Sequence, residues 1–139
     1  MADRYKEVIV FLLNNNNEVL LLKRSKQEKH NANKWAPLAG HIEDFDNTIE
    51  DAAIREIKEE LGISVNRDLL IEIPLNKEKI TTKFYFTRID TNDFVLQKEE
   101  VSEVKWHDIS KVIHMMKNED ERFVSSKRII IVLESINKK

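Results

Sequence analysis

Short apolar runs rich in β-branched residues open the chain. Residues 6–13 (KEVIVFLL) and 19–24 (VLLLKR) flank four consecutive asparagines, and asparagine tolerates the left-handed backbone of tight turns. This pattern predicts a β-hairpin. Residues 34–41 (KWAPLAGH) are predicted to be extended, because Pro37 disfavours helical backbone at Ala36.

Residues 48–61 have apolar positions at the spacing that is typical of an amphipathic helix. Thr48 and Asp51 are spaced as in a capping box, with aspartate in place of the usual glutamate or glutamine. Gly62 is a natural helix end, since glycine adopts the left-handed conformation of C-terminal caps. One helix is therefore predicted between Thr48 and Gly62.

The rest of the chain predicts further strands and two further helices. Runs with β-branched and aromatic residues predict strands, and longer amphipathic runs predict helices. The strands are expected at 69–75, 79–89 and 100–106, and the helices at 108–120 and 122–136. Neither a linker nor a repeat divides the sequence, so a single α/β domain over 1–139 is expected.

Composition narrows the class of protein. Of the 139 residues, 41% are hydrophobic and 35% are charged, which is typical of a folded globular chain. The net charge of −2 provides no basic field for nucleic acid, so no nucleic-acid partner is expected. The chain has no cysteine, which excludes disulfides, thiolate metal sites and cysteine nucleophiles.

The N-terminal apolar run at 8–13 is shorter than the core of a signal peptide and far shorter than a membrane span. The lack of cysteine is consistent with a reducing compartment. We therefore expect a cytoplasmic protein that has no membrane partner.

The helix predicted at 48–61 carries acidic residues where apolar ones are expected. On a helical wheel Glu56 and Glu60 fall within the apolar arc, and Glu59 lies at its edge. Repulsion and desolvation raise the pKa values of such carboxylates unless positive charge lies among them. Arg55 can pair with Glu59 four residues later, and an all-oxygen cluster favours Mg²⁺ or Mn²⁺. The alternative is a solvated helix face with salt bridges.

Two motifs in this region resemble the Nudix hydrolase family. Residues 55–63 (REIKEELGI) carry the complete second half of the family signature, Arg-Glu-U-x-Glu-Glu-x-Gly-U, where U is aliphatic. Residues 32–43 (ANKWAPLAGHIE) resemble the preceding stretch of MutT-like members. With the strands on either side, the resemblance covers most of the chain.

The sequence departs from the signature in the loop at 43–48 (EDFDNT). Counting from Gly40 leads to Asp46, but eight residues rather than seven then separate Asp46 from Arg55. The loop is thus one residue longer than usual and lacks the expected glutamate. Ala39 and Gly40 also replace a pair of glycines. These changes bear on metal affinity and loop geometry more than on the class of reaction.

The resemblance implies an α/β/α sandwich with a mixed central sheet and a Mg²⁺-dependent pyrophosphohydrolase activity. Water would attack phosphorus in a nucleoside triphosphate or another nucleoside diphosphate derivative. The MutT-like ANK segment and the short chain favour a triphosphate. By resemblance, the ligands of Mg²⁺, or of Mn²⁺ as the alternative, are the Gly40 carbonyl and the carboxylates of Glu56, Glu59, Glu60 and Glu100.

The same resemblance implies the catalytic roles. Arg55 would orient Glu59, and the general base would be either Glu56 or a loop glutamate. Glu100 is the favoured loop residue, because it lies six residues before Trp106, a spacing found in MutT-like chains. The other loop glutamates, which compete for this role, are Glu99 and Glu103.

Three further residues are predicted to bind substrate. Arg24 matches a position from which similar enzymes bring a cation to phosphate, His41 follows Gly40, and Trp35 offers an aromatic face to a base. Each has a simpler interpretation, namely a strand-end arginine in solvent, a histidine of a turn and a core tryptophan.

Other interpretations stay open. The altered loop also fits a Nudix-fold nucleotide-binding or regulatory module without turnover, although the three helix glutamates and Arg55 are all present. An isopentenyl diphosphate isomerase, which is a related enzyme, is disfavoured because it relies on a cysteine. Both a monomer and a homodimer fit the sequence. Contacts to the base are expected from the loops at 31–35, 73–79 and 112–122.

Overall fold

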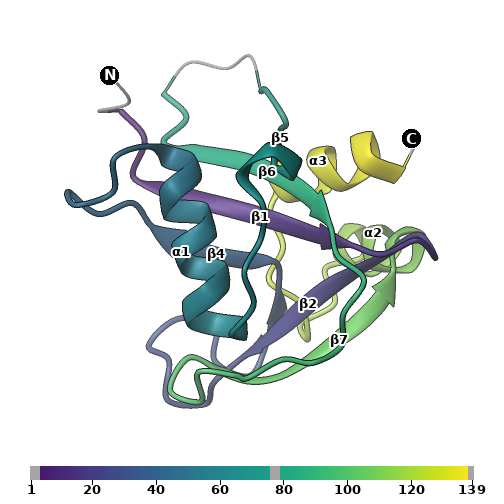
Figure 1. Ribbon diagram of the computed structural model, residues 1–139. Coiled ribbons are helices and arrows are strands. Elements are labelled where there is room, and N and C mark those ends of the chain that lie inside the picture. Colours follow the sequence, from purple (N-terminus) through teal and green to yellow (C-terminus); the bar gives the residue numbers. More distant parts are fainter. Residues whose placement is uncertain (1–3, 76–78, 138–139) are drawn as a thin grey trace.

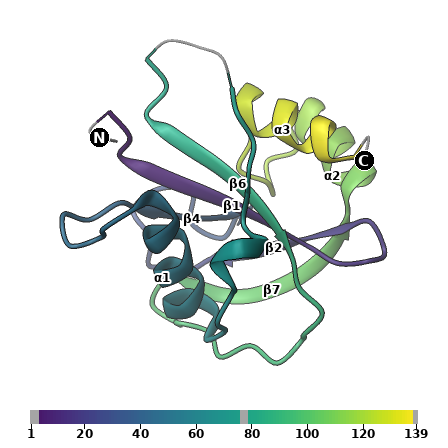
Figure 2. The same cartoon turned by 45° about the horizontal axis from the view of Figure 1, so that its top comes forward.

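The computed structural model describes residues 4–75 and 79–137. In this part of the chain seven strands form one mixed sheet, and three α-helices pack against it (Figure 1). Helix α1 (Ile49–Leu61) covers one face, and α2 (Ile109–Lys117) and α3 (Lys127–Asn137) cover the other (Figure 2). The expected α/β/α sandwich with a mixed central sheet is confirmed. Within the described ranges, every helix falls short of the length and hydrophobicity that a membrane span requires.

The predicted hairpin consists of β1 (Glu7–Leu13) and β2 (Glu18–Arg24). The two strands pair next to the asparagine turn, where Leu13 lies opposite Val19, and then diverge (Figure 1). Each strand therefore takes other partners. β1 lies parallel to β6 (Thr82–Arg88) and antiparallel to β4 (Leu38–His41), and β2 lies antiparallel to β3 (Trp35–Ala36) and β7 (Val101–Asp108).

Pro37 divides the predicted extended segment between these two branches of the sheet. β3 pairs with β2, whereas β4 crosses to β1 and places Gly40 opposite Val8. Proline has no N–H to donate to a strand ladder, and it stands here at the change of partner. The crossover brings Gly40 against the side chain of Glu56 on α1.

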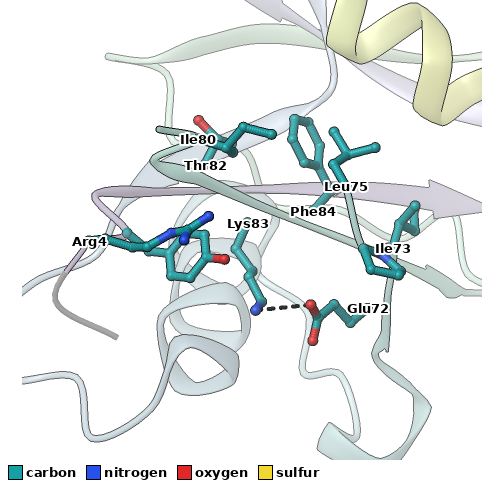
Figure 3. A pocket seen from close by; sticks show the side chains of 10 residues that line it. Arg4, Glu72, Ile73, Leu75, Ile80, Thr82, Lys83 and Phe84 are labelled. Carbon is teal, nitrogen blue, oxygen red and sulfur yellow. Dashed lines mark ion pairs between the residues drawn. The ribbon is translucent and has the colours of Figure 1, made fainter. Parts of the chain in front are cut away.

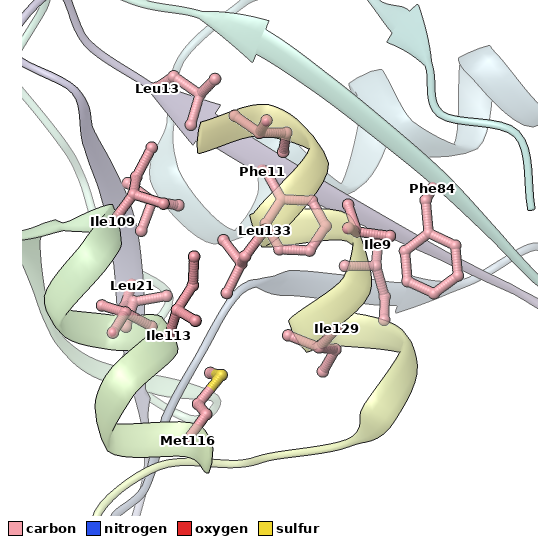
Figure 4. Packing of buried hydrophobic residues seen from close by; sticks show 14 of the residues in the cluster. Ile9, Phe11, Leu13, Leu21, Phe84, Ile109, Ile113, Met116, Ile129 and Leu133 are labelled. Atoms are coloured by element: carbon pink, nitrogen blue, oxygen red, sulfur yellow. The ribbon is translucent and has the colours of Figure 1, made fainter. Parts of the chain in front are cut away.

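β1 is buried on both faces, and its alternating side chains supply two cores. A strand that is covered on both faces reads as a continuous apolar run, which is the pattern at 8–13. Ile9, Phe11 and Leu13 pack with α2 and α3 (Figure 4), and Val8, Val10 and Leu12 pack with α1. β1 is thus the strand on which both halves of the core are built.

Helix α1 begins and ends where the sequence predicts. The hydroxyl of Thr48 accepts a hydrogen bond from the backbone N–H of Asp51 at 3.0 Å. Gly62 closes the helix with a φ of +72°, and its N–H donates to the carbonyl of Lys58 at 2.9 Å. The buried face carries Ala52, Ala53, Ile57 and Leu61, together with Glu56 and Glu60.

The second half of the chain differs from the expectations in two places. The strand expected at 69–75 is reduced to β5 (Ile71–Glu72), and its first residue, Leu69, ends a short 3₁₀ helix at 67–69. The helix expected at 122–136 is wrong at its start, since α3 begins at Lys127. The other predicted strands and helices are present with shifted ends.

The late start of α3 has a physical reason in the pairing of its preceding residues with β3. The N–H of Trp35 donates to the carbonyl of Arg122 at 2.8 Å, and the N–H of Val124 donates to the carbonyl of Trp35 at 2.8 Å. A helix through these residues would lose both bonds. Ser126 then accepts the N–H of Ile129 on its hydroxyl at 3.1 Å, which caps the first turn of α3.

Gly62→Ala is expected to lower the free energy of unfolding by about 1–2 kcal/mol, because left-handed backbone disfavours a Cβ by about that amount. The added Cβ would also stand 2.9 Å from the Cβ of Val95, whose residue is 75% exposed. Urea denaturation measures the change.

Two controls separate the backbone effect from the steric one. Gly62→Asn should lose less stability, since asparagine accepts this conformation. Val95→Gly in the Gly62→Ala background removes the Cβ that the added Cβ meets, and should recover the steric part relative to Val95→Gly alone. A Gly62→Ala protein as stable as the wild type would contradict the assigned role of the glycine.

Candidate active site

A cavity of about 450 Å³ opens beside α1 and β4. Seven of the residues predicted for the site line it: Arg24, Gly40, His41, Arg55, Glu56, Glu59 and Glu100. Glu60 lies behind it, in a smaller cavity of about 40 Å³ that Arg24 and Glu100 also line. We call the larger space the carboxylate cavity. Segments that are far apart in the sequence thus meet at one place.

The closest approach in this site is between Gly40 and Glu56. A Cβ added at Gly40 would lie 2.1 Å from the carboxyl carbon of Glu56 and 2.5 Å from one of its oxygens. Any larger residue would therefore displace the Glu56 carboxylate. The glycine keeps its own backbone within reach of the same space that the carboxylate faces.

Glu60 is the most perturbed acid of the site. Burial, followed by the hydrogen bond and the charge of neighbouring Glu56, raises the pKa of Glu60 to about 9, and Arg24 opposes the rise. The pKa of Glu100 is also raised, first by burial and then by the charge of Glu56. Glu60 therefore carries a proton at neutral pH when no cation is present. The wheel position that marked Glu56 and Glu60 as unusual corresponds to real burial, at 9% and 7% exposure.

Arg55 is held by a set of oxygen acceptors around its guanidinium. Its Nε and Nη2 donate to the two carboxylate oxygens of Asp46 at 2.9 and 2.8 Å. Nη1 donates to Glu56 at 3.0 Å and to Glu59 at 3.3 Å, and Nη2 also reaches the carbonyl of His41 at 3.0 Å. The predicted pairing with Glu59 is present, but the bidentate partner is Asp46.

Asp46 is the structural residue that the sequence pattern missed. Its side chain is 3% exposed, and the hydrogen bond from Arg55 lowers the pKa of its carboxyl group. Asp46 also accepts the N–H of Glu43 at 2.8 Å and returns its own N–H to the Glu43 carbonyl at 3.0 Å. With this tight turn, the Asp46 carboxylate reaches Arg55 although the spacing in the sequence is one residue longer than in the signature.

The oxygen atoms of the site are of the kind that binds a hard cation. Five glutamates line the carboxylate cavity, and Gln97, which lines it too, has a buried side-chain oxygen that accepts no hydrogen bond from the described residues. Burial first, and then the charge of neighbouring Glu56, raises the pKa values of Glu60 and Glu100, so a cation placed among these carboxylates would be stabilised. Oxygen ligands of this kind are those that Mg²⁺ and Mn²⁺ prefer.

The acidic side chains of the site do not form a preassembled set of metal ligands in the described part of the chain. Among residues 4–75 and 79–137, no group of three or more histidine, cysteine or acidic side chains stands close enough to hold a metal ion. The carboxylate of Glu59 is 50% exposed and turned to Arg55. The predicted metal role of these residues stays a prediction.

The other predicted residues fall on different sides of the fold. Arg24 lines the carboxylate cavity, although its guanidinium also donates to Glu28 at 2.9 Å and to the carbonyl of His30 at 3.0 Å. His41 is exposed at the edge of the cavity. Trp35 lines neither this cavity nor the smaller one behind it.

Trp35 belongs to an aromatic cluster on the α2 and α3 side of the sheet. Its ring packs edge-on against that of His107, with the ring centres 5.1 Å apart. The ring of His107 packs in the same way against that of Phe123, with the centres 5.8 Å apart. Burial lowers the pKa of His107. The packing against the core agrees with the simpler interpretation of Trp35, and its stacking on a base stays a prediction. Part of one loop expected to contact the base, residues 76–78, lies outside the described residues.

The structure distinguishes the three loop glutamates by position. Glu100 lines the carboxylate cavity. Glu103 lies within 3.9 Å of Lys23, with which it forms an ion pair on the surface. Glu99 is exposed and is not a lining residue of that cavity. Glu100 is thus the loop glutamate that the fold brings to the helix carboxylates.

A second cavity, of about 360 Å³, lies at the edge of the sheet near the N-terminal segment (Figure 3). Arg4 and Lys83 line it together with apolar side chains such as Leu75 and Phe84. The ammonium of Lys83 is already paired with Glu72 at 2.9 Å. Its lining holds one acid, Glu72, so the carboxylate cavity is the better candidate for catalysis.

Comparison with known protein families finds a domain family that spans most of the chain. The family model of the NUDIX domain matches residues 3–126. None of the curated proteins compared with the chain matches it.

Several solved structures share the fold. A MutT protein from Methanosarcina mazei is 25% identical, with a TM-score of 0.70 over 97% of this chain and 96% of that one. A C. elegans Ap4A hydrolase in a binary complex is 21% identical, with a TM-score of 0.69 over 96% of each chain. The NUDIX domain of Shewanella oneidensis NrtR, complexed with ADP ribose, is 16% identical, with a TM-score of 0.66 over 96% of this chain and 86% of that one.

Asp46→Asn is expected to destabilise the protein by about 1–3 kcal/mol near neutral pH, because Arg55 loses its bidentate partner but keeps Glu56 and Glu59. In the folded state the pKa of Asp46 lies below its ordinary value of about 3.9. Its stabilising effect is therefore complete above about pH 4 and is lost as the pH falls through the folded-state pKa. Thermal unfolding should show a Tm difference between wild type and variant that narrows below about pH 4.

Asp44→Asn is the matched control, since Asp44 is exposed in the same loop. It should leave Tm nearly unchanged at pH 7. An equal loss in both variants, or a Tm difference that stays constant with pH, would contradict the pairing of Asp46 with Arg55.

Proposed function

Because the chain belongs to the Nudix family of hydrolases, we propose that it hydrolyses a diphosphate linkage in a nucleoside triphosphate or another nucleoside diphosphate derivative. The observation that carries this proposal is the gathering of Glu56, Glu59 and Glu100 on one cavity, with Glu60 buried behind it. Arg55 supports two of these carboxylates through one guanidinium.

A divalent cation belongs to this proposal. The Gly40 carbonyl and the carboxylates of Glu56, Glu59, Glu60 and Glu100 would hold Mg²⁺ or Mn²⁺. When bound, such an ion offsets the charge of the diphosphate and favours deprotonation of the attacking water. The buried, proton-carrying Glu60 would release its proton to bind the ion, since a nearby positive charge lowers the pKa of a carboxyl group.

The other steps of the proposed reaction are assigned to side chains of the protein. Glu100, or Glu56 in its place, accepts the proton of the water that attacks phosphorus, and the phosphoanhydride bond breaks as the new P–O bond forms. The raised pKa of Glu100 makes it a better proton acceptor than a solvated carboxylate. Arg55 is a positioning residue for Glu56 and Glu59. Arg24 would bind substrate phosphate, and His41 at the cavity edge would assist.

Nucleotide-type substrates are supported by the relatives as well as by the site. The C. elegans relative is an Ap4A hydrolase, and the Shewanella domain is complexed with ADP ribose. Both ligands contain a nucleoside joined to a phosphoanhydride. A panel of nucleoside triphosphates, dinucleoside polyphosphates and nucleotide sugars, with Mg²⁺ and separation of the products, tests the proposal and shows which phosphorus is attacked.

A second candidate function is nucleotide binding without turnover. The loop at 43–48, which departs from the family signature and lacks its usual glutamate, favours it. Wild-type protein that binds nucleotides but releases no product at millimolar Mg²⁺ would select this function over hydrolysis.

Glu59→Gln, Glu60→Gln and Glu100→Gln are each expected to lower kcat by about 10²–10⁴-fold, because each removes a proton acceptor or a cation ligand. Steady-state kinetics on the best substrate of the panel measures the loss. Glu99→Gln is the matched control for Glu100→Gln and should keep a near-normal rate. Near-normal rates in all of the variants would remove the catalytic assignment.

Mg²⁺ is expected to raise the Tm of the wild type, because a ligand that binds the native state alone stabilises it. Glu60→Gln should reduce this rise, whereas Glu99→Gln should keep it. Thermal unfolding with and without Mg²⁺ measures the effect independently of turnover. A wild-type Tm that is indifferent to both Mg²⁺ and Mn²⁺ would argue against the cation site.

A further inference from the structure

Phe45 is an exposed aromatic residue at the carboxylate cavity. It lies in the loop between β4 and α1, and 71% of the residue is exposed. It lines the cavity together with Arg55, Glu56 and Glu59. Isolated exposed apolar residues are ordinary on protein surfaces, but this one borders a space whose other walls are largely charged.

The loop holds Phe45 in place. Two hydrogen bonds join Glu43 and Asp46 across the turn that contains Phe45. The N–H of Glu43 donates to the Asp46 carboxylate at 2.8 Å, and the N–H of Asp46 donates to the Glu43 carbonyl at 3.0 Å. Asp46 is in turn fixed by its bidentate bond to Arg55. The guanidinium carbon of Arg55 stands 5.1 Å from the centre of the Phe45 ring. The ring thus rests against Arg55 and leaves most of its surface in solvent.

An aromatic ring that is already ordered can bind a flat partner at low entropic cost. Preorganised groups gain affinity because little freedom remains to be lost on binding. Nucleobases stack on aromatic side chains whatever their identity, since every base has a π-face. Among the residues that line the carboxylate cavity, Phe45 has the only hydrocarbon ring. Trp35, the stacking residue predicted from the sequence, packs instead with His107.

We propose that Phe45 is the stacking surface for the base of the nucleotide whose diphosphate occupies the carboxylate cavity. The proposal rests on the proposed function, because it takes the diphosphate to lie between Arg24 and the helix glutamates. Phe45 is then a specificity residue that favours diphosphates carrying a planar aromatic group. Phe45 belongs to the loop at 43–48, which departs from the family signature.

The test compares two ligands that share one uncleavable group. α,β-Methylene-ADP and methylenediphosphonate both present a P–C–P linkage, but the first alone carries a base. Calorimetry with Mg²⁺ gives the Kd of each for the wild type, Phe45→Ala, Phe45→Leu and Phe45→Trp. Phe45→Ala and Phe45→Leu should weaken the nucleotide about tenfold and leave methylenediphosphonate unchanged. Phe45→Trp should retain nucleotide affinity.

Kinetics on the best nucleotide substrate gives a second measurement. Loss of the ring should raise KM about tenfold and change kcat less than about twofold, since a stacked base is held equally in the ground and transition states. Val95→Ala, which removes another exposed apolar side chain, should change neither value. Because Phe45 is exposed, all variants should keep the wild-type Tm.

The outcomes separate this proposal from the proposed function. If the wild type binds α,β-methylene-ADP, the Phe45 variants weaken this binding and no nucleotide is cleaved, the proposed hydrolysis is wrong and the stacking role stands. Unchanged nucleotide affinity in Phe45→Leu would overturn the stacking role alone, as would a loss in Trp35→Leu in its place. Equal weakening of both ligands would assign Phe45 to loop structure instead. Wild-type protein that binds no nucleotide overturns both proposals.

Discussion

The site depends on two carboxylates that are buried on the apolar face of one helix. Glu56 and Glu60 share that face with the alanines and aliphatic residues that hold α1 against the sheet. Because the helix is fixed by this packing, the two acids cannot retreat into water without unpacking the core. The charge of Glu56 is offset in place by Arg55, and that of Glu60 by a retained proton or by a cation. A surface helix with the same sequence would impose no such requirement.

The loop between β4 and α1 holds the arginine that contacts these carboxylates. Arg55 is the one guanidinium that contacts both Glu56 and Glu59, and Asp46 fixes its orientation from the loop. The same turn sets the position of Phe45 and borders His41 and Gly40. Charge balance within the site and the shape of its edge are therefore determined by one arginine–aspartate pair. This links the residues of the proposed chemistry to those that would select the substrate.

The central part of the fold could be predicted because its signals are local. The apolar run of β1, the period of α1 and the Gly62 cap each follow from steric or periodic rules that operate over a few residues. The predictions that failed depended on distant partners. Residues 122–126 are not helical because they pair with Trp35, and the hairpin diverges because β4 and β7 compete for its strands. No local pattern contains that information.

By itself the sequence determined the α/β class, the helix that carries the glutamates and the set of oxygen donors, because these follow from the residue types and the helical period. The tertiary structure decided which of these residues meet. Of the three loop glutamates it placed Glu100 on the carboxylate cavity, and it packed Trp35 against His107 and brought Asp46 to Arg55 across a tight turn. The sequence gives the number of residues between Asp46 and Arg55. Whether their side chains meet depends on the backbone conformation of the turn, which that number does not specify.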